Sequence, residues 1–113
     1  IRDSVLFPVR NLLEGLSNED VKEYNKYFYL LCKISKLTTI NSFEVPLWQL
    51  LKDSELNQIM FDREIESRIT QLADVDIILM PSISTLQFTA PIFQESLRNI
   101  PLWELNSMFT KCK

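Results

Sequence analysis

One stretch, Phe61 to Ala90, limits the folds open to this 113-residue chain more than any other. Apolar residues in its first half recur at the i, i+4, i+7 and i+8 spacing of one helix face; they are Ile65, Ile69, Leu72 and Ala73. Asp62 stands where a helix N-cap accepts a backbone N–H from the first turn, so we expect a helix to begin there. The period then changes to that of strands, which predicts the order helix, strand, turn, strand.

The second half of this stretch predicts two strands joined by a turn. Residues 76–80 (DIILM) are β-branched and apolar, and residues 85–90 (TLQFTA) alternate between apolar and polar side chains, as strands do. Residues 81–85 (PSIST) supply turn-forming side chains without a glycine.

The first of these strands has apolar side chains on both faces. Ile77 and Leu79 point to one face, and Ile78 and Met80 to the other. Because only one face of a small hairpin packs on helices, two of these side chains need another cover. The cover is either the flanking helices and the N-terminal segment, or a partner, since large exposed apolar patches mark association sites.

Length and composition predict one folded domain. The chain is 46% apolar and contains seven Phe, which excludes a disordered segment. No signal peptide and no run of about 18 apolar residues is present, so no membrane association is expected. Because the sequence begins at Ile1 rather than Met and ends in a Lys-rich stub, we expect a fragment of a longer protein.

Several kinds of site are excluded by residue type. The chain has no His and only two cysteines, Cys32 and Cys112, so zinc ligation of the usual kinds and His-dependent catalysis are not expected. Cys32 lies in a helical pattern and is expected to be a small buried side chain. A single glycine, Gly15, provides no phosphate-binding loop. We therefore predict no cofactor, no metal and no enzymatic activity.

The N-terminal segment, residues 1–16, carries an apolar cluster interrupted by proline. Pro8 is expected to prevent a helix through this cluster but to start one that runs to Glu14, with Gly15 as its C-terminal stop. Two roles remain open for the segment: docking on the domain's own core, or contact with a partner.

A central helix is predicted from about residue 18 to residue 35. Ser17 to Asp20 resembles a capping box at its start. Its apolar residues form one broad face; they are Val21, Tyr24, Tyr27, Phe28, Leu31 and Ile34. A row of lysines lies opposite: Lys22, Lys26, Lys33 and Lys36. The row is either a solvated face or a contact for nucleic acid or an acidic protein.

The remaining elements follow from prolines and short apolar runs. Residues 37–44 suit a short edge strand, and Pro46 is placed to start a helix with Leu47, Leu50 and Leu51 on its buried side. Two further helices are expected to start at Pro91 and at Pro101.

The closing residues resemble the end of the winged-helix domain in the origin-recognition and initiator AAA+ family. There an alternating wing strand leads into a helix with leucine and a base near its end, followed by a short apolar segment. The matching positions are Leu86, Phe88, Ala90, Ile92, Leu97, Arg98 and Leu102. Residues 61–78 resemble the family's recognition helix running into its wing, and residues 26–37 resemble its first helix.

This resemblance, added to the element order, implies an α+β, mostly helical fold. We expect a winged helix, which is a helix-turn-helix variant, with a short three-stranded sheet and flanking N- and C-terminal helices. Residues 1–113 would form a single domain: an N-terminal docking segment at 1–16, the winged-helix core at 18–105, and a C-terminal end at 106–113.

Charge separates this chain from the origin-binding members of the family, which carry Arg or Lys on the recognition helix and wing. Here residues 61–73 have a net charge of −1, residues 81–85 contain no base, and the whole chain has a net charge of −3. DNA-binding domains usually carry a basic excess. The chain is most similar to the silencing branch of the family, the silent-information-regulator paralogues of the origin-recognition large subunit.

That similarity implies a non-catalytic winged helix that homodimerises within a chromatin-silencing scaffold in the nucleus. Other silencing proteins would be contacted through the parent protein. The candidate interface residues are the apolar side chains of the hairpin and the N-terminal cluster: Ile78, Met80, Ile83, Phe7 and Val5. We predict that Ile78→Asp or Met80→Asp converts a dimer into a folded monomer.

The alternative is a winged helix that binds double-stranded DNA with residues 62–73. Its candidate contacts are Arg63, Arg68 and Thr70, each of which would have to face outward. The shortage of Lys and Arg side chains in this region disfavours this alternative. An enzyme with paired carboxylates is a third hypothesis, but Glu64 and Glu66 are two residues apart on a helix and do not face each other.

Overall fold

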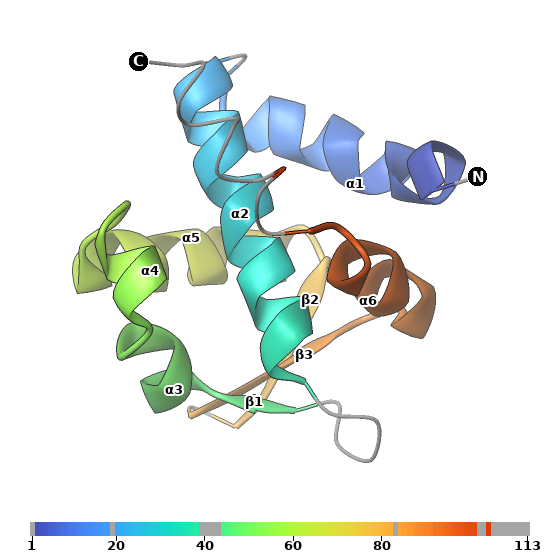
Figure 1. Ribbon diagram of the computed structural model, residues 1–113. Coiled ribbons are helices and arrows are strands. Elements are labelled where there is room, and N and C mark those ends of the chain that lie inside the picture. The colour runs from blue at the N-terminus through green and yellow to red at the C-terminus, as the bar shows by residue number, and fades with distance from the viewer. Residues whose placement is uncertain (1, 19, 39–43, 83, 102–103, 105–113) are drawn as a thin grey trace.

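The computed structural model describes residues 2–18, 20–38, 44–82, 84–101 and 104, with side chains from Phe7 onward. Within these residues the fold is α+β and mostly helical, with six helices and three strands (Figure 1). In chain order they are α1 (Arg2–Leu16), α2 (Val21–Leu37), β1 (Val45–Pro46), α3 (Leu47–Leu51), α4 (Ser54–Asn57), α5 (Asp62–Asp74), β2 (Ile78–Ser82), β3 (Thr85–Phe88) and α6 (Pro91–Arg98). The predicted fold class is confirmed at this level.

The three strands form one antiparallel sheet in the order β1-β3-β2. Val45 of β1 pairs with Leu86 of β3, and Ile78 of β2 pairs with Phe88. The register shifts between Leu79 and Ser82, so the hairpin contains a bulge that interrupts the regular ladder.

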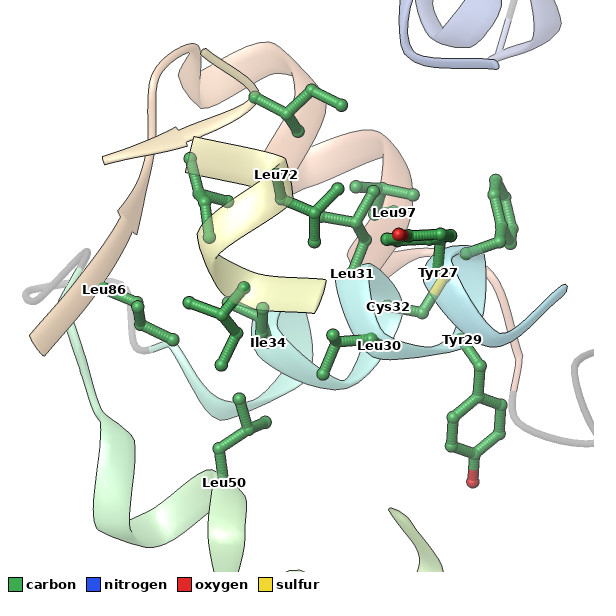
Figure 2. Close-up of a cluster of buried hydrophobic side chains, with 14 of the residues drawn as sticks. Tyr27, Tyr29, Leu30, Leu31, Cys32, Ile34, Leu50, Leu72, Leu86 and Leu97 are labelled. Carbon is green, nitrogen blue, oxygen red and sulfur yellow. The ribbon is translucent and has the colours of Figure 1, made fainter. Parts of the chain in front are cut away.

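Helix α2 is the centre of the molecule, with α3 and α4 on one side of it and α6 on the other (Figure 1). Every residue from Tyr27 to Ser35 is buried, although the sequence pattern predicts only one apolar face. Figure 2 shows side chains of α2 meeting Leu72 of α5, Leu86 of β3 and Leu97 of α6 in one cluster. Because other elements surround α2, its side chains are buried on every face. Cys32 is buried, as predicted.

The predicted start of α2 is wrong by one turn. The helix begins at Val21, and Asp20 is its N-cap, with its carboxylate accepting hydrogen bonds from the backbone N–H of Lys22 at 2.9 Å and Glu23 at 3.3 Å. Ser17 instead donates its hydroxyl back to the carbonyl of Glu14. Asp20 caps the helix because one carboxylate oxygen, Oδ1, accepts from both of these orphan N–H groups of the first turn.

Helix α1 runs unbroken through Pro8, contrary to the prediction that proline would interrupt it. Val9 and Leu13 are fully buried, and α1 packs on both α2 and α6. Burying each such side chain stabilises the fold by about 1.5–3 kcal/mol, which offsets the cost of about 3 kcal/mol for an interior proline. Gly15 lies inside the helix, and Asn18, at φ 53°, is the left-handed residue beyond its end.

The predicted edge strand at residues 37–44 is tested only at its ends, where the described residues are not in a strand. Leu37 still belongs to α2, residues 39–43 lie outside the described residues, and the strand is Val45–Pro46. Pro46 acts as the N-cap of α3 rather than its first helical residue. Helix α4 follows at once because the carboxylate of Asp53 accepts the backbone N–H of Leu56.

The C-terminal ends of α2 and α6 lie side by side. Each helix carries a basic side chain that donates hydrogen bonds to the last carbonyl groups of the other. Lys36 donates from Nζ to the carbonyl oxygens of Arg98 at 2.9 Å and Ile100 at 2.6 Å. Arg98 donates to the carbonyl oxygens of Ser35 and Thr38, both at 3.2 Å, and also to the Thr38 hydroxyl. The helix predicted from Pro101 onward falls mostly outside the described residues.

Candidate interaction surface on the β2–β3 hairpin and helix α5

The four apolar side chains of the first hairpin strand divide into two buried and two exposed, but not in the predicted pairs. Ile77 and Ile78 are buried, whereas Leu79 is 42% and Met80 is 39% exposed. Ile78 is 0% exposed and belongs to the protein's own core, so its assignment to an interface is wrong.

The backbone before β2 explains this division. Asp76 adopts a left-handed conformation at φ 62°, and Ile77 donates its N–H to the carbonyl of Leu72 at 3.1 Å. The N–H of Ile77 is therefore still held by the last turn of α5, and the strand begins one residue later, at Ile78. Strand alternation starts at Ile78, which points inward, and Leu79 points outward. The register shift after Leu79 breaks the alternation, and Met80 is exposed as well.

The hairpin lies in the longest uncharged part of the chain. Residues 77–94 contain no Asp, Glu, Lys or Arg. The exposed residues around Leu79 and Met80 are themselves neutral: Pro81, Ser82 and Ser84. In a protein of net charge −3, this is a surface that a second copy can approach without bringing like charges together.

The other candidate interface residues are only partly placed by the structure. Phe7 is 62% exposed on α1, so its side chain is available to a partner. Val5 is helical, but its side chain lies outside the described part, and Ile83 also lies outside the described residues.

Helix α5 does not present the basic side chains that the DNA-binding hypothesis requires. Arg68 is 7% exposed, donates to the Glu23 carboxylate at 2.6 Å, and lies over the Tyr27 ring. Its predicted role as an outward DNA contact is therefore wrong, since Glu23 and the packing of α2 on α5 hold it inside. Arg63 and Thr70 are exposed as predicted.

The exposed face of α5 is acidic. Its charged, exposed residues are three acids and one base, a net charge of −2; they are Asp62, Glu66, Asp74 and Arg63. Asp62 is not the N-cap that the sequence predicts. Phe61 occupies that position, and its N–H is accepted by the Glu64 carboxylate at 2.9 Å.

The lysine row of α2 is not a solvated face. Lys33 is buried and pairs with Asp53 at 3.1 Å and Glu55 at 2.9 Å. Burial favours a lower pKa for Lys33, but its hydrogen bonds to Glu55 and Asp53 outweigh that effect and the pKa is raised.

The other three lysines differ in exposure. Lys26 lies 3.8 Å from Glu64, and Lys36 binds the carbonyls at the end of α6. Lys22 is exposed. Three of the four lysines therefore serve contacts within the protein.

A groove at the start of α5 is a feature that the sequence reasoning missed. It has a volume of about 840 Å³ and is lined by Leu51, Asn57, Met60, Phe61, Asp62, Arg63 and Glu64. Phe61 is 80% exposed at this groove. The sequence signal was present, because an aromatic residue stood directly before the acids of a helix start, where a polar cap is preferred.

The described residues contain no group of three or more Cys, Asp or Glu side chains that could hold a metal ion. Among the described helices, none is long and apolar enough to cross a membrane. Comparison of the chain with protein-family models, curated proteins and solved structures finds no match.

Proposed function

We propose that this chain is a winged helix that joins protein subunits by forming a homodimer. The order α2, β1, α3–α4, α5, β2, β3 with sheet order β1-β3-β2 supports the winged-helix assignment. In that assignment α5 occupies the place of the recognition helix, and the β2–β3 hairpin is the wing.

The observation that carries the dimer proposal is the pair of exposed apolar side chains, Leu79 and Met80, on an uncharged hairpin. The bulge beside them lies in the edge strand β2 and hinders its backbone from pairing with the sheet edge of another molecule. Association is therefore expected through the side chains of this patch. A two-fold symmetric pair would place this patch against its copy. Phe7 on α1 is a further candidate for the same interface.

The biological setting rests on the resemblance to the silencing branch of the origin-recognition family. On that basis the dimer serves as an assembly module of a chromatin-silencing scaffold in the nucleus, with no catalytic role. Other silencing proteins would bind elsewhere on the parent protein. The acidic exposed face of α5 and the inward position of Arg68 weigh against DNA as the partner of this domain.

The test is the oligomeric state of the wild type and of aspartate variants, measured by sedimentation equilibrium. We expect a wild-type dimer and folded monomers for Leu79→Asp and Met80→Asp, because each places a charge in an apolar contact. Val21→Asp is the matched control: Val21 is 63% exposed at the first position of α2, away from the hairpin.

The control variant is expected to remain a dimer. Ile78→Asp is expected to unfold, since its side chain is buried in the core. A monomeric wild type at 100 µM would rule out the proposed function; a dimer that survives both hairpin variants would remove the hairpin from the interface.

A further inference from the structure

The groove at the start of α5 has walls that are fixed by the fold. Asn57 donates its side-chain N–H to the carbonyl of Leu51 at 2.9 Å, which ties the end of α4 to the end of α3. Asp53 caps α4 and also pairs with Lys33 of α2. The groove shares no residue with the exposed hairpin patch.

Phe61, on one wall of this groove, has no evident role in folding. It is 80% exposed, the largest exposed fraction among the large apolar side chains that the structure describes. It also occupies an N-cap position, where Ser, Thr, Asp or Asn would satisfy a free N–H and phenylalanine makes no side-chain hydrogen bond. Positions that break a local rule without a gain in packing are expected at functional or strained sites, and the backbone of Phe61 is not strained.

The chemistry around Phe61 combines an apolar surface with an acidic border. The half-buried Leu51 contributes apolar surface beside Phe61, and the buried Met60 forms the floor beneath them. The first turn of α5 adds the exposed Asp62 and Arg63, whereas the Glu64 carboxylate already accepts the Phe61 N–H and lies near Lys26 and Arg68. One turn further along α5, Glu66 adds a second exposed acid. Such a surface complements a segment that carries an apolar anchor between lysines or arginines.

We infer that this groove binds a basic amphipathic segment of another protein, with Phe61 as the central contact. This second surface goes beyond the proposed dimer and does not depend on it. A helix with apolar residues at i, i+3, i+4 and i+7 would place its apolar side on Phe61 and its lysines toward the acids of α5.

The experiment measures binding of a synthetic amphipathic helix with leucine on one face and lysine on the other, by isothermal titration calorimetry. The comparison peptide has every lysine replaced by glutamate. The wild-type protein is expected to bind the lysine peptide and not the glutamate peptide. Phe61→Ser is expected to weaken binding at least tenfold and to raise the Tm, because serine is a better N-cap than phenylalanine.

Opposite effects on binding and stability separate a contact residue from a structural one. Trp48→Ser is the matched control: Trp48 is 58% exposed on α3 and does not line the groove, so binding is expected to be unchanged. Asp62→Asn is expected to weaken binding severalfold.

Equal binding of the lysine peptide to wild type and Phe61→Ser, or no binding to wild type, would overturn the inference. Conversion of a wild-type dimer to a monomer by Phe61→Ser would also overturn it, because a second copy would then occupy the groove. None of these outcomes decides whether the hairpin variants dissociate the dimer.

Discussion

Lys33 is a charged residue in the interior, and its partners decide whether it stabilises the fold. Its amine lies within 3.1 Å of Asp53 and 2.9 Å of Glu55. Desolvation costs free energy for any buried charge, and here two carboxylates compensate. Asp53 is mostly buried and also caps α4, so the ion pair connects α2 to the α3–α4 corner.

We predict that Lys33→Met destabilises the protein by about 1–3 kcal/mol, because Asp53 is left buried without its cation. The pKa of Lys33 is raised in the folded state, so the unfolded chain loses its proton first as pH rises. The stabilisation is therefore complete below about pH 10.4 and is lost as pH rises through the folded pKa.

Urea unfolding of wild type and Lys33→Met between pH 7 and pH 11 checks this. The tyrosines add to the alkaline loss in both proteins, because burial raises the pKa of Tyr24, Tyr27 and Tyr29. The difference between the two proteins should shrink above pH 10.5. A constant difference across this range would show that Lys33 does not stabilise the fold through its charge.

At the scale of elements, the ends of α2 and α6 form one unit. Each helix ends in carbonyl groups that lack intrahelical partners, and each receives a base from the other: Lys36 at the end of α6, and Arg98 at the end of α2. A positive charge at a helix C-terminus is also favoured by the helix dipole.

We predict that Arg98→Met and Lys36→Met each cost about 1–3 kcal/mol, because each leaves carbonyls without a donor. The double variant should cost less than the sum of the single variants by about 0.5 kcal/mol or more, since loosening one helix end releases the other base. Chemical denaturation of the four proteins measures the cycle, with the exposed Arg63→Met as a near-neutral control. Strict additivity would show that the two caps act independently.

The elements that the sequence predicts correctly are those defined by local pattern. Helix α5, the existence of two hairpin strands and the helix at Pro91 follow from periodicity and from proline at a helix start. The bounds of the first strand do not: the sequence predicts it at 76–80, and β2 runs from Ile78 to Ser82, into the predicted turn. Pro8 and Gly15 misled the prediction for α1 because local propensity favours a break, while burial of Val9 and Leu13 against other helices holds the helix together.

For the candidate site, the sequence did not predict the direction in which each side chain points. The sequence shows four apolar residues at 77–80. Because only one face of a small hairpin packs on helices, two of them need to be covered by another element or by a partner. The sequence does not show that the left-handed Asp76 delays the start of strand alternation by one residue. Arg68 likewise looked like a surface base, because its partner Glu23 is 45 residues away in the sequence.

At the scale of the whole molecule, net charge sets how self-association should respond to salt. Each copy carries −3 and measures 35 × 32 × 26 Å along its principal axes, so the centres of two copies in contact lie about 30 Å apart. Their unscreened repulsion in water is about 1.2 kcal/mol. With a Debye length of about 30 Å at 0.01 M salt and about 10 Å at 0.1 M, most of the remaining repulsion disappears over this range.

We therefore predict that the dimer Kd falls about twofold between 0.01 M and 0.1 M salt, because screening removes repulsion and the neutral hairpin contact contains no ion pair to weaken. The same preparation should not bind a DNA duplex at 0.05 M salt, whereas a DNA-reading domain would bind there and lose affinity steeply as salt rises.

Sedimentation equilibrium at the two salt concentrations measures the change in the dimer Kd. A dimer that weakens tenfold with salt would contradict the neutral contact, because only charged partners lose that much affinity to screening.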